Sequence, residues 1–260
     1  MFIRQSVLCA AAALCLSVHA QAPVPSASTL DHVQKAGVLR ICTPGNYRPF
    51  SFQKADAEFE GIDVDLMASL STSLGVKPQW IKTSWSNLMG DMTGGRCDLA
   101  VGGIRVTTER QKRAFFSTAY MVNGKTPIAR CADMAKFQTV ADIDKPTVKV
   151  IFNPGGSNER FARANFKQAQ MTLHPENLTI FDELLAGRAD VFVTESAEAI
   201  TQQRLKPGLC AINPDKPLQY GEMAYLLPRD DVAFKAYVDQ WLHLSKAGGD
   251  YQRVVDRWLK

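Results

Sequence analysis

Two glutamates three residues apart are the side chains best suited to proton transfer. Glu195 and Glu198 follow an apolar run, residues 191–193, that predicts a strand, and residues 195–205 predict a helix. The i, i+3 spacing turns both carboxyl groups toward one side. In a dry cleft two neighbouring carboxylates cannot easily both ionise, so one could stay protonated as a general acid. The alternative is a pair of acids that only stabilise the positive end of the helix dipole.

Two glycine-containing loops could hold an anionic group. Residues 102–110 follow an expected strand, and there the glycines allow close backbone approach while Arg110 could grip a carboxylate. Residues 153–159 run from an expected strand into a helix, whose first N–H groups could bind an anion. Ordinary helix caps are the alternative explanation for both loops. Gly124-Lys125-Thr126 is not a phosphate loop, because Ala119 stands where that motif requires glycine.

Two aromatic residues stand at the ends of expected strands. Tyr47 lies in the loop 43–50, and Trp85 opens a helix directly after a strand. Either ring could stack on a ligand, although turn chemistry explains the Pro, Gly and Asn around Tyr47, and a half-exposed tryptophan can simply pack. The histidines are scattered and no paired Cys/His spacing is present, so a metal centre is not predicted.

The elements that must position these residues alternate between strand and helix, which favours parallel sheets with helical crossovers. The pattern predicts strands at 38–42, 79–82, 99–101, 148–152, 191–193 and 223–227. It predicts helices at 62–74, 86–92, 158–165, 178–186, 195–205, 232–246 and 251–259. Ligands of such sheets bind outside the carboxyl ends of the strands, so the loops that follow residues 42, 101, 152 and 193 should line one cleft.

The chain is therefore expected to be an α/β protein with two lobes. Each lobe would have a central, mostly parallel sheet flanked by helices, and the cleft would lie at a two-strand hinge. Lobe 1 would comprise residues 29–124 and 222–260, and lobe 2 would comprise residues 125–221.

The N-terminus carries the features of an exported protein. Arg4 precedes an apolar run from Val7 to Val18, and Val18-His19-Ala20 suits a cleavage site. Residues 1–20 are thus predicted to be a signal peptide and residues 21–28 a tether, which places the protein in the periplasm. No stretch approaches the roughly 20 apolar residues of a membrane span. The net charge of +4 is interspersed with acids, so nucleic-acid binding is not suggested.

Four cysteines would remain after removal of the signal peptide, in an oxidising compartment. A bridge between Cys131 and Cys210 is favoured. Cys42 lies late in one expected strand and Cys97 just before another, and parallel neighbours would hold them at opposite ends of the sheet. Both are therefore expected to be free and buried.

Four segments, taken together, resemble the family 3 extracellular solute-binding proteins that feed amino-acid transporters: residues 47–50, 61–65, 107–110 and 221–227. The resemblance spans almost the whole chain after residue 20, and it implies the two-lobed fold of type II periplasmic binding proteins. It also implies that Tyr47 and Trp85 sandwich the ligand. Arg110 would then bind the ligand's carboxylate with the Ser157 region, and Glu195 would hold its amine.

Within that fold the chain is more similar to the periplasmic cyclohexadienyl dehydratases, through residues 83–89, 124–128, 153–165 and 237–242. This resemblance implies dehydration with decarboxylation of prephenate or arogenate, small-molecule chemistry that needs no cofactor. Glu198 would be the general acid, and Lys125 would act with it by holding a carboxylate. The other cleft residues that the resemblance implies are Trp85, Asn153, Ser157 and Asn158.

Three residues depart from that family's pattern. Asn46 stands where an acid is expected, Arg105 where a small hydroxyl residue is expected, and Glu195 where an aspartate is usual. Arg105 could grip a second carboxylate or fill the pocket, so the choice between prephenate and arogenate stays open. The alternative function is a transport receptor for an amino acid or another small carboxylate. Such a receptor has no need for a second acid at Glu198.

Overall fold

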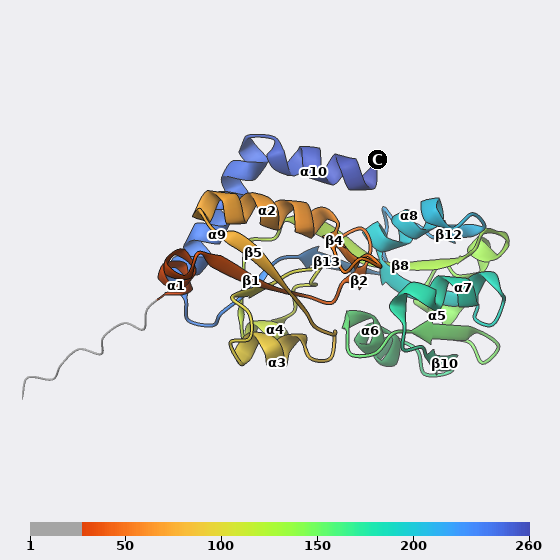
Figure 1. The fold of residues 1–260 in the computed structure, drawn as a ribbon. Helices are drawn as coiled ribbons and strands as arrows, with labels where there is room; N and C mark the ends of the chain where they lie inside the picture. Colours follow the sequence, from red (N-terminus) through yellow and green to blue (C-terminus); the bar gives the residue numbers. More distant parts are fainter. Residues whose placement is uncertain (1–27) are drawn as a thin grey trace, which may run out of the picture.

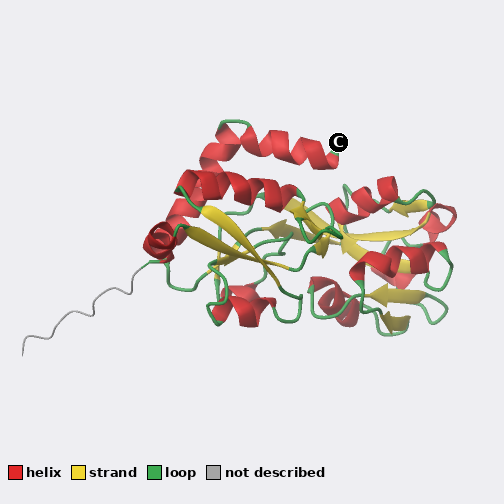
Figure 2. Cartoon of the chain, viewed as in Figure 1, coloured by secondary structure: helices red, strands yellow, loops and turns green. Residues whose placement is uncertain are grey.

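A computed structural model describes residues 28–260, which form two α/β lobes (Figure 1). The predicted signal peptide and the tether, apart from Ser28, lie outside these described residues. In both lobes the helices lie on either side of the strands (Figure 2). Between residues 28 and 260, no helix is long and apolar enough to cross a membrane.

The sheet of lobe 1 has five strands in the order β5-β1-β6-β14-β7. Strand β1 pairs in parallel with β5 and β6, whereas β14 runs antiparallel to β6 and β7. The strands are β1 (Val38–Thr43), β5 (Lys77–Lys82), β6 (Leu99–Ala100), β7 (Phe115–Phe116) and β14 (Leu226–Leu227). A small antiparallel sheet, β2 (Asn46–Tyr47), β3 (Ser51–Gln53) and β4 (Phe59–Glu60), follows β1.

The helices of lobe 1 are α1 (Thr29–Ala36), α2 (Ile62–Leu74), α3 (Leu88–Thr93), α4 (Thr108–Gln111), α9 (Val232–Ala247) and α10 (Asp250–Leu259). Helix α2 has the bounds expected from the sequence. Its buried residues include Ile62, Leu66 and Leu70, which share one face, and it ends at Gly75 with a φ of 71°. The C-terminal helices α9 and α10 both contact α2, and α9 also contacts α1.

The sheet of lobe 2 has the order β10-β9-β11-β8-β12, and β13 also pairs with β8. Strands β10, β9 and β11 are parallel neighbours, and all pairs with β8 are antiparallel. The strands are β8 (Met121–Arg130), β9 (Lys149–Phe152), β10 (Gln170–Leu173), β11 (Val191–Glu195), β12 (Leu209–Ala211) and β13 (Gln219–Met223). Both sheets are thus mixed, with parallel pairing confined to one side, rather than mostly parallel as expected.

Short helices surround this second sheet. They are η1 (Cys131–Lys136), α5 (Val140–Ile143), α6 (Ser157–Asn165), η2 (Asn177–Thr179), α7 (Ile180–Leu185) and α8 (Ser196–Leu205). Strand β8, which the sequence pattern did not reveal, is the longest strand of the described chain. Gly124, Lys125 and Pro127 interrupt the apolar pattern there, and tertiary pairing with three other strands overrides that weak local signal.

Strands β8 and β13 connect the two lobes. They pair antiparallel from Met121↔Met223 to Lys125↔Gln219, so two chain crossings run side by side. We propose that the lobes divide within this pair, between residues 124 and 125 and between residues 221 and 222, as expected from the sequence.

Two disulfides occur in the described chain. Cys131 is bonded to Cys210, the pair favoured from the sequence. Cys42 is bonded to Cys97, with their Cα atoms 5.7 Å apart, so the expectation that both are free is wrong. Strand β6 begins only at Leu99, and Cys97 lies in the turn that follows α3. That turn carries Cys97 onto the same face of the sheet as Cys42, where both pack beside Leu88.

Candidate active site

Two buried glutamates lie at the junction between β11 and α8. Glu195 is the last residue of β11 and caps α8 without a side-chain capping bond, while Glu198 lies in the first turn of that helix. Their exposed fractions are 1% and 0%. The sequence pattern predicts that both start the helix. In the structure Glu195 belongs to strand β11 and Glu198 to helix α8, so their carboxyl groups have different neighbours.

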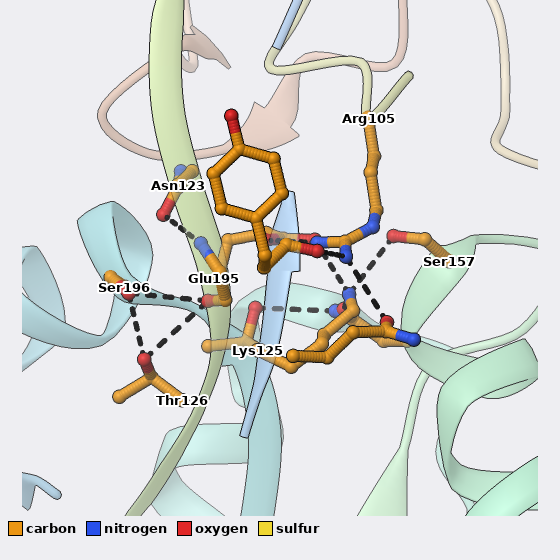
Figure 3. Close-up of polar contacts among 12 residues, drawn as sticks. Arg105, Asn123, Lys125, Thr126, Ser157, Glu195 and Ser196 are labelled. Carbon is orange, nitrogen blue, oxygen red and sulfur yellow. Dashed lines mark hydrogen bonds and ion pairs between the residues drawn. The ribbon is translucent and has the colours of Figure 1, made fainter. Parts of the chain in front are cut away.

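The carboxylate of Glu195 receives two cations, one from each lobe. Arg105 Nη1 lies 3.0 Å from Oε1 and 2.9 Å from Oε2. Lys125 Nζ lies 2.7 Å from Oε1. Figure 3 shows both side chains converging on Glu195. All three side chains are buried, so the carboxylate of Glu195 and its two cationic partners form a buried ion-pair cluster.

Lys125, on strand β8, connects the β8–β11 pair with the start of helix α6. It stands directly opposite Glu195 in the β8–β11 register. Its Nζ donates to Ser157 Oγ at 3.0 Å and also to Asn158 Oδ1. Burial lowers the pKa of Lys125 to about 8, against the attraction of Glu195. Lys125 therefore carries its charge at neutral pH and titrates just above it.

Glu198, three residues after Glu195, lies in an environment that favours the protonated form of its carboxyl group. Burial raises its pKa to about 8, although hydrogen bonds from Thr194 and Asn177 oppose that rise. Asn177 Nδ2 donates to Oε1 at 2.9 Å, and the Thr194 hydroxyl donates to Oε2. At neutral pH this carboxyl is mostly protonated, which is the state that a general acid requires.

Aromatic side chains from lobe 1 form one wall beside these groups. The rings of Tyr47 and Trp85 meet edge to face with centroids 5.4 Å apart. Trp85 Nε1 donates to Asn46 Oδ1 at 3.1 Å. The hydroxyl of Tyr47 lies 3.5 Å from Thr194 Oγ1 in lobe 2. Asn46, where an acid was expected, thus orients Trp85 through a neutral amide.

The loop before α6 approaches lobe 1 through a glycine. Gly155 has a φ of 79°, and a Cβ there would lie 2.7 Å from the backbone nitrogen of Ser86. Only a residue without a side chain allows that contact. In the same loop Asn153 Oδ1 accepts from Asn158 Nδ2 at 3.3 Å, and Asn158 Nδ2 also donates to Thr194 Oγ1 at 3.2 Å. The amide network therefore continues from Lys125 to the neighbourhood of Glu198.

Arg110 joins the group indirectly. It is buried on α4 and donates from Nη1 to the carbonyl oxygen of Arg105 at 2.9 Å. Burial lowers its pKa to about 10, so it stays cationic at neutral pH. Two of the residues predicted for the site make no side-chain hydrogen bond, ion pair or ring contact to the others in the described structure: Arg110 is connected through the backbone of Arg105, and Glu198 through Thr194 and Asn177. Each of the other nine contacts at least one predicted residue through its side chain.

Two residues that sequence reasoning missed complete the network. Asn177 donates from Nδ2 to the Asn46 carbonyl oxygen at 3.0 Å, in the other lobe, as well as to Glu198. Thr194 contacts Tyr47, Asn158 and Glu198. Thr194 precedes Glu195 at the carboxyl end of a strand, which is a usable signal. Asn177 was hidden because a polar residue before an expected helix is routinely just a cap.

Comparison with known proteins gives a consistent result. Residues 39–260 match the model of the bacterial extracellular solute-binding proteins, family 3. The chain is 47% identical over 247 residues to a cyclohexadienyl dehydratase of Pseudomonas aeruginosa, covering 95% of this chain and 92% of that protein.

Two solved structures of reconstructed ancestral proteins are also similar. One is an amino acid-binding protein described as a precursor of cyclohexadienyl dehydratase, with a TM-score of 0.83 and 30% identity over 90% of this chain and all of that one (100%). The other is an ancestral cyclohexadienyl dehydratase, with a TM-score of 0.57 and 44% identity over 90% of this chain and 97% of that one.

Proposed function

The chain belongs to the bacterial extracellular solute-binding proteins of family 3, and from that premise we propose that it is a cyclohexadienyl dehydratase. The reaction removes water and carbon dioxide from prephenate, giving phenylpyruvate, or from arogenate, giving phenylalanine. The 47% identity to a curated cyclohexadienyl dehydratase over nearly the full length supports this activity. A binding receptor for an amino acid is the alternative that the same fold allows.

The observation that carries the proposal is the buried carboxyl of Glu198, whose pKa burial raises to about 8. It lies where the two lobes meet, linked to lobe 1 through Asn177 and the backbone of Asn46. Glu195, by contrast, forms ion pairs with Arg105 and Lys125. The two carboxyl groups thus have different environments within one site. Glu198 is suited to act as an acid, and Glu195 to act as an electrostatic anchor. Simple ligand binding has no use for the protonated one.

In the proposed mechanism Glu198 protonates the departing 4-hydroxyl of the substrate. The carbon–oxygen bond breaks as water leaves, and the bond to the ring carboxylate breaks as carbon dioxide leaves. The electron pair of the second bond enters the ring and makes it aromatic. Glu198 is left as a carboxylate and takes a proton from solvent before the next turnover.

The remaining site residues are proposed to bind and orient the substrate. Lys125, with Ser157 and Asn158 at the start of α6, would hold one substrate carboxylate, and Arg110 the other. Tyr47 and Trp85 would lie against the substrate ring. Closure of the lobes excludes water, which strengthens these charge interactions and keeps Glu198 protonated.

We further propose that residues 1–20 direct export and are removed, so that the enzyme works in the periplasm. The family is extracellular, and the two disulfides of the described chain are typical of an oxidising compartment.

The test is incubation of the purified protein with prephenate and, separately, with arogenate, beside controls without enzyme. Phenylpyruvate is measured by its absorbance in alkali, and phenylalanine by chromatography. Turnover of either substrate above the control supports the dehydratase. Tight calorimetric binding of an amino acid without turnover would instead establish a receptor.

A further inference from the structure

Arg105 is buried at the hinge and contacts the acid that a solute-binding protein of this kind would use for an amine. We propose that Arg105 determines substrate specificity, by occupying Glu195 so that the site selects a 2-keto acid side chain over a 2-ammonium side chain. The inference rests on the proposed dehydratase function and names prephenate as the preferred substrate.

The first support is the occupancy of the Glu195 carboxylate. A substrate ammonium would have to compete for the Glu195 oxygens with the cations that already contact them. Arg105 Nη1 contacts both oxygens, at 3.0 and 2.9 Å, and Lys125 Nζ approaches Oε1 at 2.7 Å. The side chains of Arg105 and Glu195 are only 8% and 1% exposed. Breaking so buried a pair to admit an ammonium is costly, because it leaves a guanidinium without its partner.

The second support is that the hinge is shaped around the guanidinium. Arg105 Nη2 donates to Gln219 Oε1 at 3.1 Å and to the carbonyl oxygen of Tyr220. Gly221 lies beneath it, and a Cβ at that position would come within 2.1 Å of Nη1 and 2.4 Å of Cζ. Strand β13 therefore has a glycine where any other residue would push the guanidinium away. This fixes Arg105 in place on Glu195.

The third support is charge balance. Arg105, Lys125 and Arg110 bring three buried cations to the site against the carboxylate of Glu195. Prephenate carries two carboxylates and no cation. Arogenate carries the same two carboxylates and an ammonium, which the excess positive charge repels. The keto oxygen of prephenate can instead accept a hydrogen bond from the guanidinium or ammonium groups.

The experiment compares kcat/KM for both substrates in the wild type, Arg105→Ser and Gly221→Ala. Removing the guanidinium, or displacing it with the new Cβ, exposes Glu195 to the substrate amine. Both variants should raise the ratio of arogenate to prephenate kcat/KM by roughly tenfold or more. Arg253→Ser is the matched control, because it removes an arginine that is 73% exposed on α10, and its ratio should equal that of the wild type.

A binding measurement makes the test independent of turnover. Phenylpyruvate and L-phenylalanine, titrated by calorimetry, differ only in the keto and amino groups. The wild type should favour phenylpyruvate, and both variants should shift toward L-phenylalanine. Ratios unchanged within about twofold in both variants would overturn the specificity role. If Arg105→Ser does not fold, Gly221→Ala alone decides. If no form of the protein turned over either substrate, the proposed dehydratase activity would be wrong. The binding preference would still test the role of Arg105 in specificity.

Discussion

Asn177 and Glu198 are joined by a hydrogen bond of 2.9 Å, and the same amide nitrogen donates to the Asn46 carbonyl oxygen at 3.0 Å. Asn177 and Glu198 belong to lobe 2, whereas Asn46 belongs to lobe 1. The carboxyl that is proposed to give up its proton is thus attached to the contact between the lobes. Any separation of the lobes at this point would have to break the bond between Asn177 and the Asn46 carbonyl oxygen.

Replacement of Asn177 by alanine should slow the enzyme and shift its pH dependence. The amide hydrogen bond opposes the effect of burial on the pKa of Glu198, so its loss raises that pKa further. We expect kcat/KM to fall roughly 10- to 100-fold, because Asn177 would stabilise the carboxylate that forms as Glu198 gives up its proton, and this is the usual cost of losing a hydrogen bond to a charged group. The alkaline limb of the pH profile should move to higher pH. Asn165→Ala, which removes an amide on α6 that bonds only its own helix, is the control.

The pH profile of the wild type follows from two groups that titrate together. Glu198 must be protonated and Lys125 must be charged, and the pKa of each is about 8. Activity should therefore be level near neutral pH and fall by about tenfold or more per pH unit above pH 8. An initial-rate profile measured at saturating and at low substrate checks this. Activity that increased above pH 8 would mean that Glu198 works as a base.

Glu198 should also link stability to pH. Its pKa is 4.5 ordinarily and about 8 in the folded protein, so the folded state binds the proton more tightly. The stability that results is complete below pH 4.5 and is lost as the pH rises through 8. Glu198→Gln has no ionisable group here and lacks this pH dependence. The wild type should therefore lose stability relative to the variant by about 1 kcal/mol per pH unit across that range.

Urea unfolding of both proteins at several pH values measures the difference. A difference in unfolding free energy that stays constant between pH 5 and pH 8 would show that Glu198 is ionised throughout, contrary to its buried environment.

The disulfide between Cys42 and Cys97 can be tested by thiol titration. Protein purified without residues 1–20 and denatured without reductant should show no free thiol, because both pairs are bonded. Two free thiols would mean that one bridge is reduced, and mapping of the labelled peptides would show whether these are Cys42 and Cys97. Replacing both with alanine removes a cross-link between residues 55 apart in sequence, and should cost about 2–4 kcal/mol of unfolding free energy.

Regular helices and buried strands could be predicted from the sequence because their patterns are local. Helix α2 is an example, since its apolar spacing and terminal glycine both lie within the segment. Strand β8 was missed because its pairing partners lie far away in the chain. Cys97 was misplaced for a related reason: the turn after α3 depends on packing, which no local pattern reports.

The site divides in the same way. Glu198, Lys125 and the aromatic pair could be proposed from residue type and from resemblance to a family. The pairing of Arg105 with Glu195 needs residues 90 positions apart and a glycine in β13, so only the fold reveals it. Asn177 contacts Asn46 from 131 positions away, and nothing in its own neighbourhood predicts that contact.

The most direct test of the proposed mechanism is Glu198→Gln, assayed with prephenate at neutral pH beside the wild type. Glutamine keeps the shape of the side chain but cannot donate an acidic proton. Formation of phenylpyruvate should fall to the rate of the control without enzyme, while binding of phenylpyruvate by calorimetry stays within about tenfold of the wild type. A variant that turned over prephenate at the wild-type rate would contradict the assignment of Glu198 as the general acid.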